Sequence, residues 1–151
     1  MTRAVFKRLW LPSVAVAALA VLAGSGLPPL QAQTDAPYEI VAMRDVMVTA
    51  RDGVHLATDI YVPERAGPAT GRFPTIVERT PYNKASTAGG LVKYFVPRGY
   101  AVVVQDVHGR YRSEGTWRPL RDDGPDGAAD LLKWISEQPW SNGKVGTVGT
   151  S

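Results

Sequence analysis

Two short runs, residues 75–77 and 101–104, are apolar or β-branched throughout and do not alternate with polar residues. Such runs are typical of strands buried on both faces of a parallel sheet, because a strand with one wet face alternates. Between the runs, residues 91–95 predict a brief helix that ends at Pro97 and Gly99. Parallel strands joined by helices place the chain in the α/β class.

An antiparallel hairpin is expected ahead of this parallel part. Residues 39–48 and 54–61 are strand-like, and the Arg-Asp-Gly sequence at residues 51–53 is a turn signal between them. The alternation of the second strand predicts one wetter face. The members of that face are His55, Ala57, Asp59 and Tyr61.

A second helix and a last strand complete the pattern. Residues 106–123 are a long polar loop, and Asp126 is the expected N-cap of the helix that follows. Helical spacing is set by the apolar residues Leu131, Leu132, Trp134 and Ile135. Residues 145–148 predict a strand that leads into Gly-Thr-Ser at residues 149–151. The predicted fold is a hairpin followed by βαβαβ, with a mostly parallel sheet.

The first residues have the pattern of a secretory signal peptide. Residues 1–8 are positively charged, residues 9–22 are almost entirely apolar, and a small-residue stretch follows. The predicted signal peptide covers residues 1–32, with cleavage after Ser25 or after Ala32. We therefore expect a secreted or periplasmic protein that has no membrane partner after cleavage.

The net charge of +3 belongs to the leader. Arg3, Lys7 and Arg8 are three of the 17 Lys and Arg, and the remaining 14 balance the 14 Asp and Glu. A neutral body gives no electrostatic reason to expect a nucleic-acid partner. Because the chain has no cysteine, it has no disulfide framework, cysteine-ligated zinc or thiol catalysis.

Neither a cofactor nor a metal is expected. Glycines 143, 146 and 149 are spaced by three and do not form a Gly-x-Gly-x-x-Gly loop. The acidic residues Asp122, Asp123, Asp126 and Asp130 straddle a helix start, where negative charge is favourable without a metal.

Nucleophilic chemistry is indicated at residues 149–151. A strand that runs into Gly-x-Ser is the first half of a nucleophile elbow, in which a sharp turn raises the serine hydroxyl above the sheet. Taken alone, these residues leave an alternative open, in which Ser151 is an ordinary loop serine. The corresponding alternative function is a non-catalytic secreted binding or structural domain.

Four motifs occur in order. They are Arg-Asp-Gly-Val at residues 51–54, Arg-Thr-Pro-Tyr-Asn-Lys at 79–84, the segment 105–115 and the segment 141–151. Together they resemble the opening of the cocaine-esterase/NonD and Xaa-Pro dipeptidyl-peptidase-like serine hydrolases, with α-amino-acid ester hydrolases and cephalosporin acylases as the most similar members. The resemblance spans residues 45–151. It implies that residues 33–151 are the N-terminal portion of an α/β-hydrolase domain that is truncated at the nucleophile elbow.

The resemblance also implies roles for two residues. Ser151 matches the nucleophile, and Tyr82 matches the tyrosine whose phenol donates to the oxyanion. The implied function is a secreted serine hydrolase that cleaves small-molecule esters or amides of acyl or aminoacyl groups through an acyl-enzyme. In this fold the triad Asp or Glu and the His follow the serine, whereas His55 and His108 precede Ser151. Residues 1–151 alone are therefore expected to be inactive.

Structural roles are expected for several other polar and aromatic residues. His55 is expected to be a half-exposed strand residue, and His108 stands where the relatives commonly have arginine. Asp106, at the end of a buried strand, is expected to hold the loop 109–115 in place through hydrogen bonds to the backbone of the loop. Core or interface packing is expected for Trp117, Trp134 and Trp140.

Overall fold

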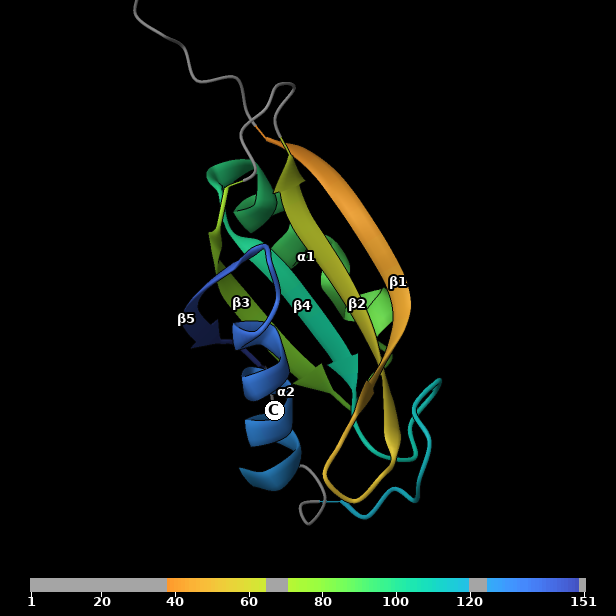
Figure 1. Cartoon of the computed structure of the whole chain (residues 1–151). Helices are drawn as coiled ribbons and strands as arrows, with labels where there is room; N and C mark the ends of the chain where they lie inside the picture. Colours follow the sequence, from red (N-terminus) through yellow and green to blue (C-terminus); the bar gives the residue numbers. More distant parts are fainter. Residues whose placement is uncertain (1–37, 65–70, 120–124, 150–151) are drawn as a thin grey trace, which may run out of the picture. The chain divides into compact units, whose positions relative to one another are not determined.

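A five-stranded mixed sheet carries the fold (Figure 1). The computed structural model describes residues 38–64, 71–119 and 125–149, which all belong to one compact unit, Asp35–Ser151. The predicted signal peptide, with both of its cleavage positions, lies outside the described residues. The strands are β1 (Glu39–Thr49), β2 (His55–Glu64), β3 (Phe73–Thr80), β4 (Ala101–Asp106) and β5 (Ser141–Thr147), in the spatial order β1-β2-β4-β3-β5.

The predicted antiparallel hairpin is confirmed for β1 and β2. The two strands pair along their length, with Val48 opposite Leu56. At the turn between them, Gly53 has a φ of 83° and its amide donates to the Ala50 carbonyl at 2.9 Å. Glycine adopts this positive φ without steric cost, which is why the Asp-Gly signal marks the turn.

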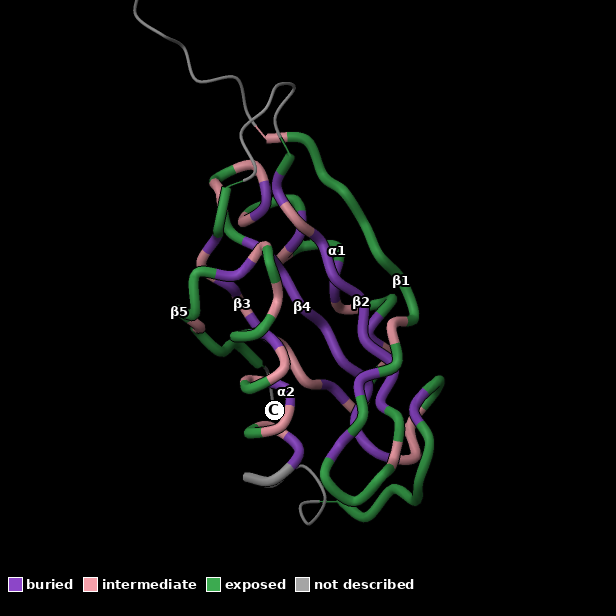
Figure 2. The backbone as a smooth tube through the Cα atoms, in the orientation of Figure 1, coloured by how far each residue is buried: buried purple, intermediate pink, exposed green. Residues whose placement is uncertain are grey.

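Strand β2 is buried on both faces, so the prediction of one wetter face is wrong (Figure 2). Ala57, Asp59 and Tyr61 are all buried, and His55 at the start of the strand is exposed. Tyr61 packs in an apolar cluster with residues of α1 (Lys84–Phe95), so a helix covers the face that the alternation assigned to solvent. The exposed strand of the hairpin is β1, at the sheet edge.

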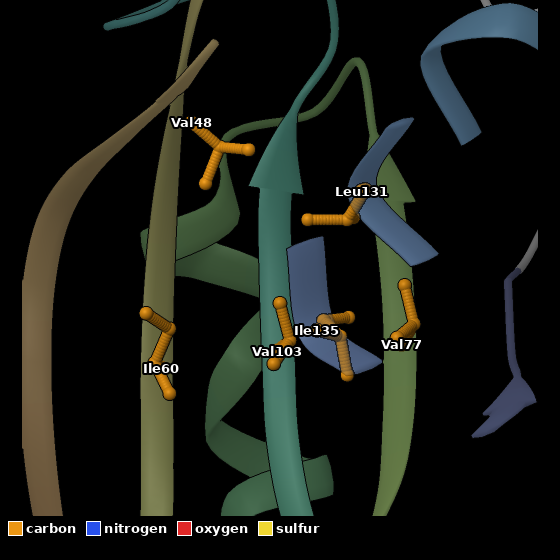
Figure 3. Packing of buried hydrophobic residues seen from close by; sticks show 6 residues of the cluster. All are labelled: Val48, Ile60, Val77, Val103, Leu131 and Ile135. Carbon is orange, nitrogen blue, oxygen red and sulfur yellow. The ribbon is translucent and has the colours of Figure 1, made fainter. Parts of the chain in front are cut away.

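Strands β3 and β4 are parallel and central, as predicted. All six residues of β4 are buried, and its three valines alternate between two apolar clusters. Val103 contributes to the cluster formed with α2 (Pro125–Ser136), whereas Val102 and Val104 contribute to the cluster formed with α1. Each face of the sheet therefore has its own apolar layer, which explains the absence of polar alternation in the sequence. Figure 3 shows the first cluster, which consists of Val48, Ile60, Val77, Val103, Leu131 and Ile135.

Helix α1 is longer than the predicted segment 91–95. It begins at Lys84, and the Asn83 side chain caps its first turn. The sequence pattern missed these early turns because they contain two consecutive glycines, which have low helix propensity. The predicted end is confirmed, since the short 3₁₀ turn η1 (Val96–Arg98) follows and Gly99 closes it with a φ of 84°.

Helix α2 begins at Pro125, a residue that suits the first helical position because it has no amide hydrogen to leave unpaired. Asp126 therefore lies inside the helix, and its prediction as the N-cap is wrong. The buried Leu131 and Ile135 confirm the predicted helical spacing. No helix within the described residues is both long and apolar enough to cross a membrane.

Strand β5 begins at Ser141 rather than at residue 145, and it pairs in parallel with β3. The predicted order of hairpin and βαβαβ is thus confirmed. Because β3, β4 and β5 run in the same direction, their carboxyl ends meet at one edge of the sheet. The segments that follow these three strands form the candidate site.

Candidate active site

A cavity of about 600 Å³ lies where the carboxyl ends of β3 and β5 approach α2. Its wall includes Thr80 and Tyr82 at the end of β3, Trp117 from the loop after β4, Leu131 of α2, and Gly149 after β5. Small-molecule sites commonly have volumes of about 300–1,000 Å³. Open α/β sheets bind ligands beyond the carboxyl ends of their strands, so this cavity is the candidate active site.

The predicted oxyanion donor, Tyr82, lies in the wall of this cavity. It follows β3 by two residues, on the loop that supplies an oxyanion donor in α/β-hydrolases. Tyr82 is 57% exposed, and its amide donates to Thr80 Oγ1 at 3.0 Å. A neutral phenol can donate a hydrogen bond to a developing oxyanion without the cost of burying a charge.

The predicted nucleophile, Ser151, lies outside the described residues, and its role stays a prediction. The backbone is described as far as Gly149, two residues before it. Val148 and Gly149 both line the cavity, and the Val148 amide donates to the Val77 carbonyl at 2.9 Å. Strand β5 therefore brings the chain to the cavity two residues ahead of Ser151.

The loop after β4 folds tightly at Gly109. This residue has a φ of 63°, and a Cβ there would lie 2.1 Å from the Trp117 amide nitrogen, so no other residue fits without movement. The close approach holds Trp117 in the cavity wall, where it is exposed. Of the two predicted alternatives for Trp117, packing in the core is therefore wrong, and packing at an interface stays a prediction. Core packing is confirmed for Trp134 and Trp140, whose rings meet edge to face and which are partly buried against the α2 cluster.

Arg110 connects this loop with the Tyr82 loop. Its Nε donates to the Pro81 carbonyl at 3.0 Å. Its guanidinium carbon lies 4.4 Å from the centroid of the Trp117 ring and 5.1 Å from that of Tyr111, in cation–π contact with both. Because Pro81 directly precedes Tyr82, Arg110 holds the backbone next to the predicted donor.

Asp106 pins the loop after β4 as predicted, and it also holds the start of α1. Its carboxylate accepts from the Lys84 amide at 2.8 Å and more weakly from the Arg112 amide at 3.5 Å, while its own carbonyl accepts from Ser113 Oγ at 2.7 Å. Burial raises the pKa of the Asp106 carboxyl above its ordinary value, even though the two amide hydrogen bonds favour the charged form.

Lys84 is a residue that the sequence analysis missed. Its Nζ lies 2.7 Å from Asp45 Oδ1 and 2.9 Å from Asp59 Oδ1, and all but a few per cent of its side chain is buried. The sequence feature that could have indicated Lys84 is Asp59, because a carboxylate on a buried strand requires a nearby cation. The alternation of β2 had assigned Asp59 to solvent, so that signal was not used.

The two histidines link the β1–β2 hairpin with the loop after β4. His55 Nδ1 lies 2.9 Å from Glu114 Oε2, and His108 Nε2 lies 3.3 Å from Asp52 Oδ2. His55 is exposed at the start of β2, in agreement with its predicted position. Neither histidine lines the cavity, which supports a structural role for both.

The acidic residues near the start of α2 are described only in part. Asp122, Asp123 and the side chain of Asp126 lie outside the described part of the chain. Asp130 accepts from the Arg51 amide at 2.8 Å and from its Nε at 3.1 Å, and this hydrogen bonding lowers the pKa of Asp130. Within residues 38–64, 71–119 and 125–149, no three His, Asp or Glu residues are grouped so that they could hold a metal ion.

Comparison with known proteins identifies the family. Residues 52–151, more than half of the chain, match the X-Pro dipeptidyl-peptidase (S15) family. The chain belongs to this family. The S15-family chain is 43% identical over 122 residues to the cocaine esterase of Rhodococcus sp. (strain MB1 Bresler), an alignment that covers 78% of this chain and 20% of the esterase. It therefore spans about a fifth of the length of that relative.

Solved structures confirm the predicted fold class and the resemblance. The CocE/NonD family hydrolase from Staphylococcus aureus matches with a TM-score of 0.64 and 25% identity, over 74% of this chain and 23% of that one. An α-amino acid ester hydrolase matches with a TM-score of 0.61 and 31% identity, over 83% of this chain and 24% of that one. The S15-family chain thus has the α/β fold of these hydrolases over the part that aligns, and its family includes esterases.

Proposed function

We propose that the S15-family chain carries the nucleophile and one oxyanion donor of a secreted serine hydrolase, which cleaves esters or amides of small acyl or aminoacyl groups. Ser151 is the nucleophile and Tyr82 is the donor. One observation carries the proposal: Tyr82 and Gly149, the residue two positions before Ser151, line the same cavity. Two trans peptide units span at most about 7.6 Å, so a nucleophile two residues beyond Gly149 is within reach of a carbonyl bound there.

The proposed reaction proceeds through an acyl-enzyme. Ser151 Oγ bonds to the substrate carbonyl carbon, and its proton passes to a general base, which in α/β-hydrolases is a histidine that follows the serine. The carbonyl oxygen becomes an oxyanion that accepts a hydrogen bond from the Tyr82 phenol. The bond to the alcohol or amine then breaks, and that leaving group takes the proton. Water attacks the acyl carbon in turn and releases the acid and the free serine.

The relatives support small esters as a substrate class. Two of the matched proteins are named as a cocaine esterase and an α-amino acid ester hydrolase, whereas the family is named for an X-Pro dipeptidyl-peptidase. Both an ester and an amide are therefore needed as probes. The cavity volume of about 600 Å³ suits a small acyl group of either kind.

Two substitutions in the full-length protein, expressed from its complete gene, test the proposal. With p-nitrophenyl acetate and an aminoacyl p-nitroanilide as probes, we expect Ser151→Ala to abolish turnover of both. Tyr82→Phe is expected to lower kcat by roughly tenfold to a thousandfold without changing Tm, as for the loss of one oxyanion donor.

Tyr94→Phe is the matched control for Tyr82→Phe. Tyr94 is 55% exposed, close to the exposure of Tyr82, but it lies on α1 and does not line the cavity. Its substitution should leave kcat unchanged. Turnover by the Ser151→Ala variant would exclude Ser151 as the nucleophile, and an unchanged kcat for Tyr82→Phe would remove Tyr82 from the mechanism.

Export is the second part of the proposed function. The positive segment, apolar run and small-residue exit within residues 1–32 support a cleaved signal peptide. N-terminal sequencing of the protein purified from the cells that produce it is expected to begin at Gly26 or Gln33. A purified protein that retains Met1 contradicts this part of the proposal and leaves the chemistry of the site untouched.

A further inference from the structure

A buried ion-pair cluster begins two residues after Tyr82. At its centre the Lys84 side chain is 4% exposed, with Nζ 2.7 Å from Asp45 Oδ1 and 2.9 Å from Asp59 Oδ1. Asp59, in β2, is only 1% exposed. Asp45 lies at the bulge in β1, and Lys84 lies in the first turn of α1, so the cluster joins three elements. The proposed reaction has no use for these charges.

The cluster holds Lys84 firmly in place. Burial disfavours the charge of Lys84, but the hydrogen bonds to Asp45 and Asp59 outweigh burial and raise the pKa of Lys84. The same hydrogen bond lowers the pKa of Asp45, whose other oxygen lies 3.3 Å from an Arg112 guanidinium nitrogen. Moving Lys84 away would leave the buried Asp59 without its closest cation, which is far more costly than keeping the pair together.

Lys84 also fixes the backbone beside Tyr82. The Lys84 amide donates to Asp106 Oδ1 at 2.8 Å. Between Lys84 and Tyr82, Asn83 has a φ of 78° and a ψ of 105°, a conformation that residues other than glycine seldom adopt. Strained residues of this kind persist where the surrounding structure over-determines them, and they concentrate at functional sites. Here Lys84 holds one side of the strained residue, and the Thr80 hydroxyl holds the other through the Tyr82 amide.

We propose that Lys84 is a positioning residue, which holds the strained turn at Asn83 and thereby fixes the direction of the Tyr82 phenol. This inference rests on the proposed function, in which the phenol donates to the oxyanion. An oxyanion donor acts only when it lies about 3 Å from the position that the charged oxygen will occupy. Releasing the turn should therefore lower kcat while KM stays nearly constant.

A double-mutant cycle in the full-length protein tests the inference. Lys84→Met keeps an unbranched apolar stem and removes the charge, and it is made alone and together with Tyr82→Phe. With p-nitrophenyl acetate, we expect Lys84→Met to lower kcat about tenfold or more and to change KM by less than about twofold. In the Tyr82→Phe background the loss of kcat should be less than about twofold, because no phenol remains to be misplaced.

The matched control is Lys133→Met. Lys133 also pairs with a carboxylate, that of Glu137, but its side chain is 74% exposed on α2. We expect its substitution to leave kcat unchanged in both backgrounds. All rates are measured below the temperature at which any variant begins to unfold.

The outcomes separate the inference from the function on which it rests. Equal losses of kcat in the two backgrounds would overturn the positioning role, because general damage to the fold does not depend on the phenol. An unchanged kcat for Lys84→Met would overturn it as well. If Tyr82→Phe alone leaves kcat unchanged, the oxyanion assignment itself fails, and that result appears in a different arm of the cycle.

Asp45→Asn supplies the same test if Lys84→Met does not fold. Asp45 has a φ of 54°, which asparagine tolerates, and its side chain is 40% exposed, so Lys84 keeps its buried partner Asp59. We expect kcat to fall about threefold with the phenol present and to be unchanged in the Tyr82→Phe background. Equal losses in both backgrounds overturn the inference here too.

Discussion

The substitution Gly109→Ala tests how the loop after β4 shapes the cavity. A methyl group at this position would lie 2.1 Å from the Trp117 amide nitrogen and 2.6 Å from the Thr116 carbonyl carbon. Both are backbone atoms, which cannot swing aside as the end of a flexible side chain can. The Trp117 backbone must recede by about 1.3 Å, from 2.1 Å to the 3.4 Å of ordinary contact. Gly109→Ala therefore moves one wall of the cavity.

The magnitude follows from two contributions to the free energy of unfolding. The φ of 63° costs an alanine about 1–2 kcal/mol. Displacing the loop also weakens the 2.8 Å hydrogen bond from the Gly109 amide to the Glu114 carbonyl, which adds about 1–2 kcal/mol. We expect a total loss of about 3 kcal/mol. Because a displacement of about 1 Å at a site can lower activity up to a hundredfold, kcat/KM should fall about tenfold or more.

Gly143→Ala is the control for this prediction. Gly143 has a φ of 80°, but no atom lies within 4 Å of the position that its Cβ would take. The assay compares thermal unfolding and kcat/KM on p-nitrophenyl acetate for the two full-length variants. We expect Gly143→Ala to lose about 1–2 kcal/mol and to keep its kcat/KM. Equal losses for the two variants would refute the reasoning, because the contact with Trp117 would then add nothing to the backbone strain.

Three further substitutions test the core, the cavity wall and the charges. Ile135→Ala removes a fully buried side chain from the α2 cluster and should cost about 3 kcal/mol in urea unfolding, and a loss below about 1 kcal/mol would contradict the packing. Trp117→Ala removes apolar surface from the cavity wall, so we expect KM for p-nitrophenyl acetate to rise about threefold to tenfold with kcat little changed. An unchanged KM would show that the substrate binds elsewhere. The lowered pKa of Asp45 means that its charge stabilises the fold above the ordinary carboxyl pKa of about 3.9, and that this stabilisation is lost as the pH falls through the folded pKa. Asp45→Asn should accordingly lower Tm at pH 7, and its difference from the wild type should shrink as the pH falls through the lowered folded pKa of Asp45. A difference that stays constant as the solution is acidified would show that the carboxylate charge is not involved.

The sequence predicts the parts of the fold that local patterns determine. The Asp-Gly signal identifies the hairpin turn because Gly53 alone needs the positive φ there. The unbroken apolar run 101–104 identifies β4 because burial on both faces excludes polar residues from either one. Each of these features depends on a few consecutive residues, so no knowledge of distant contacts was needed.

Features that depend on distant partners escaped prediction. Asp59 can be buried because Lys84, which belongs to α1, pairs with its carboxylate. The sequence of β2 does not reveal this partner, so its alternation placed Asp59 on a solvent-facing side. Helix α1 starts earlier than its apolar pattern because Asn83 caps it and Asp106 holds the Lys84 amide. Tertiary contacts of this kind override weak helix propensity.

The candidate site shows the same division. Tyr82 was identified through a family resemblance, and the structure shows it in the cavity wall. Trp117 has no local signature of its own, since the tight turn at Gly109 decides that it lines the cavity instead of packing in the core. The contribution of Arg110 likewise becomes visible only through its hydrogen bond to Pro81, on the neighbouring loop.

The proposed reaction requires the phenol of Tyr82 and the hydroxyl of Ser151 to meet at one substrate carbonyl group. A crystal structure of the full-length protein with a phosphonate bonded to Ser151 Oγ measures their relation directly, because a phosphoryl oxygen takes the place of the oxyanion. We predict a distance of about 2.5–3.0 Å between Tyr82 Oη and that oxygen. A separation beyond about 4 Å, or a phosphonate bonded to a different residue, would contradict the account.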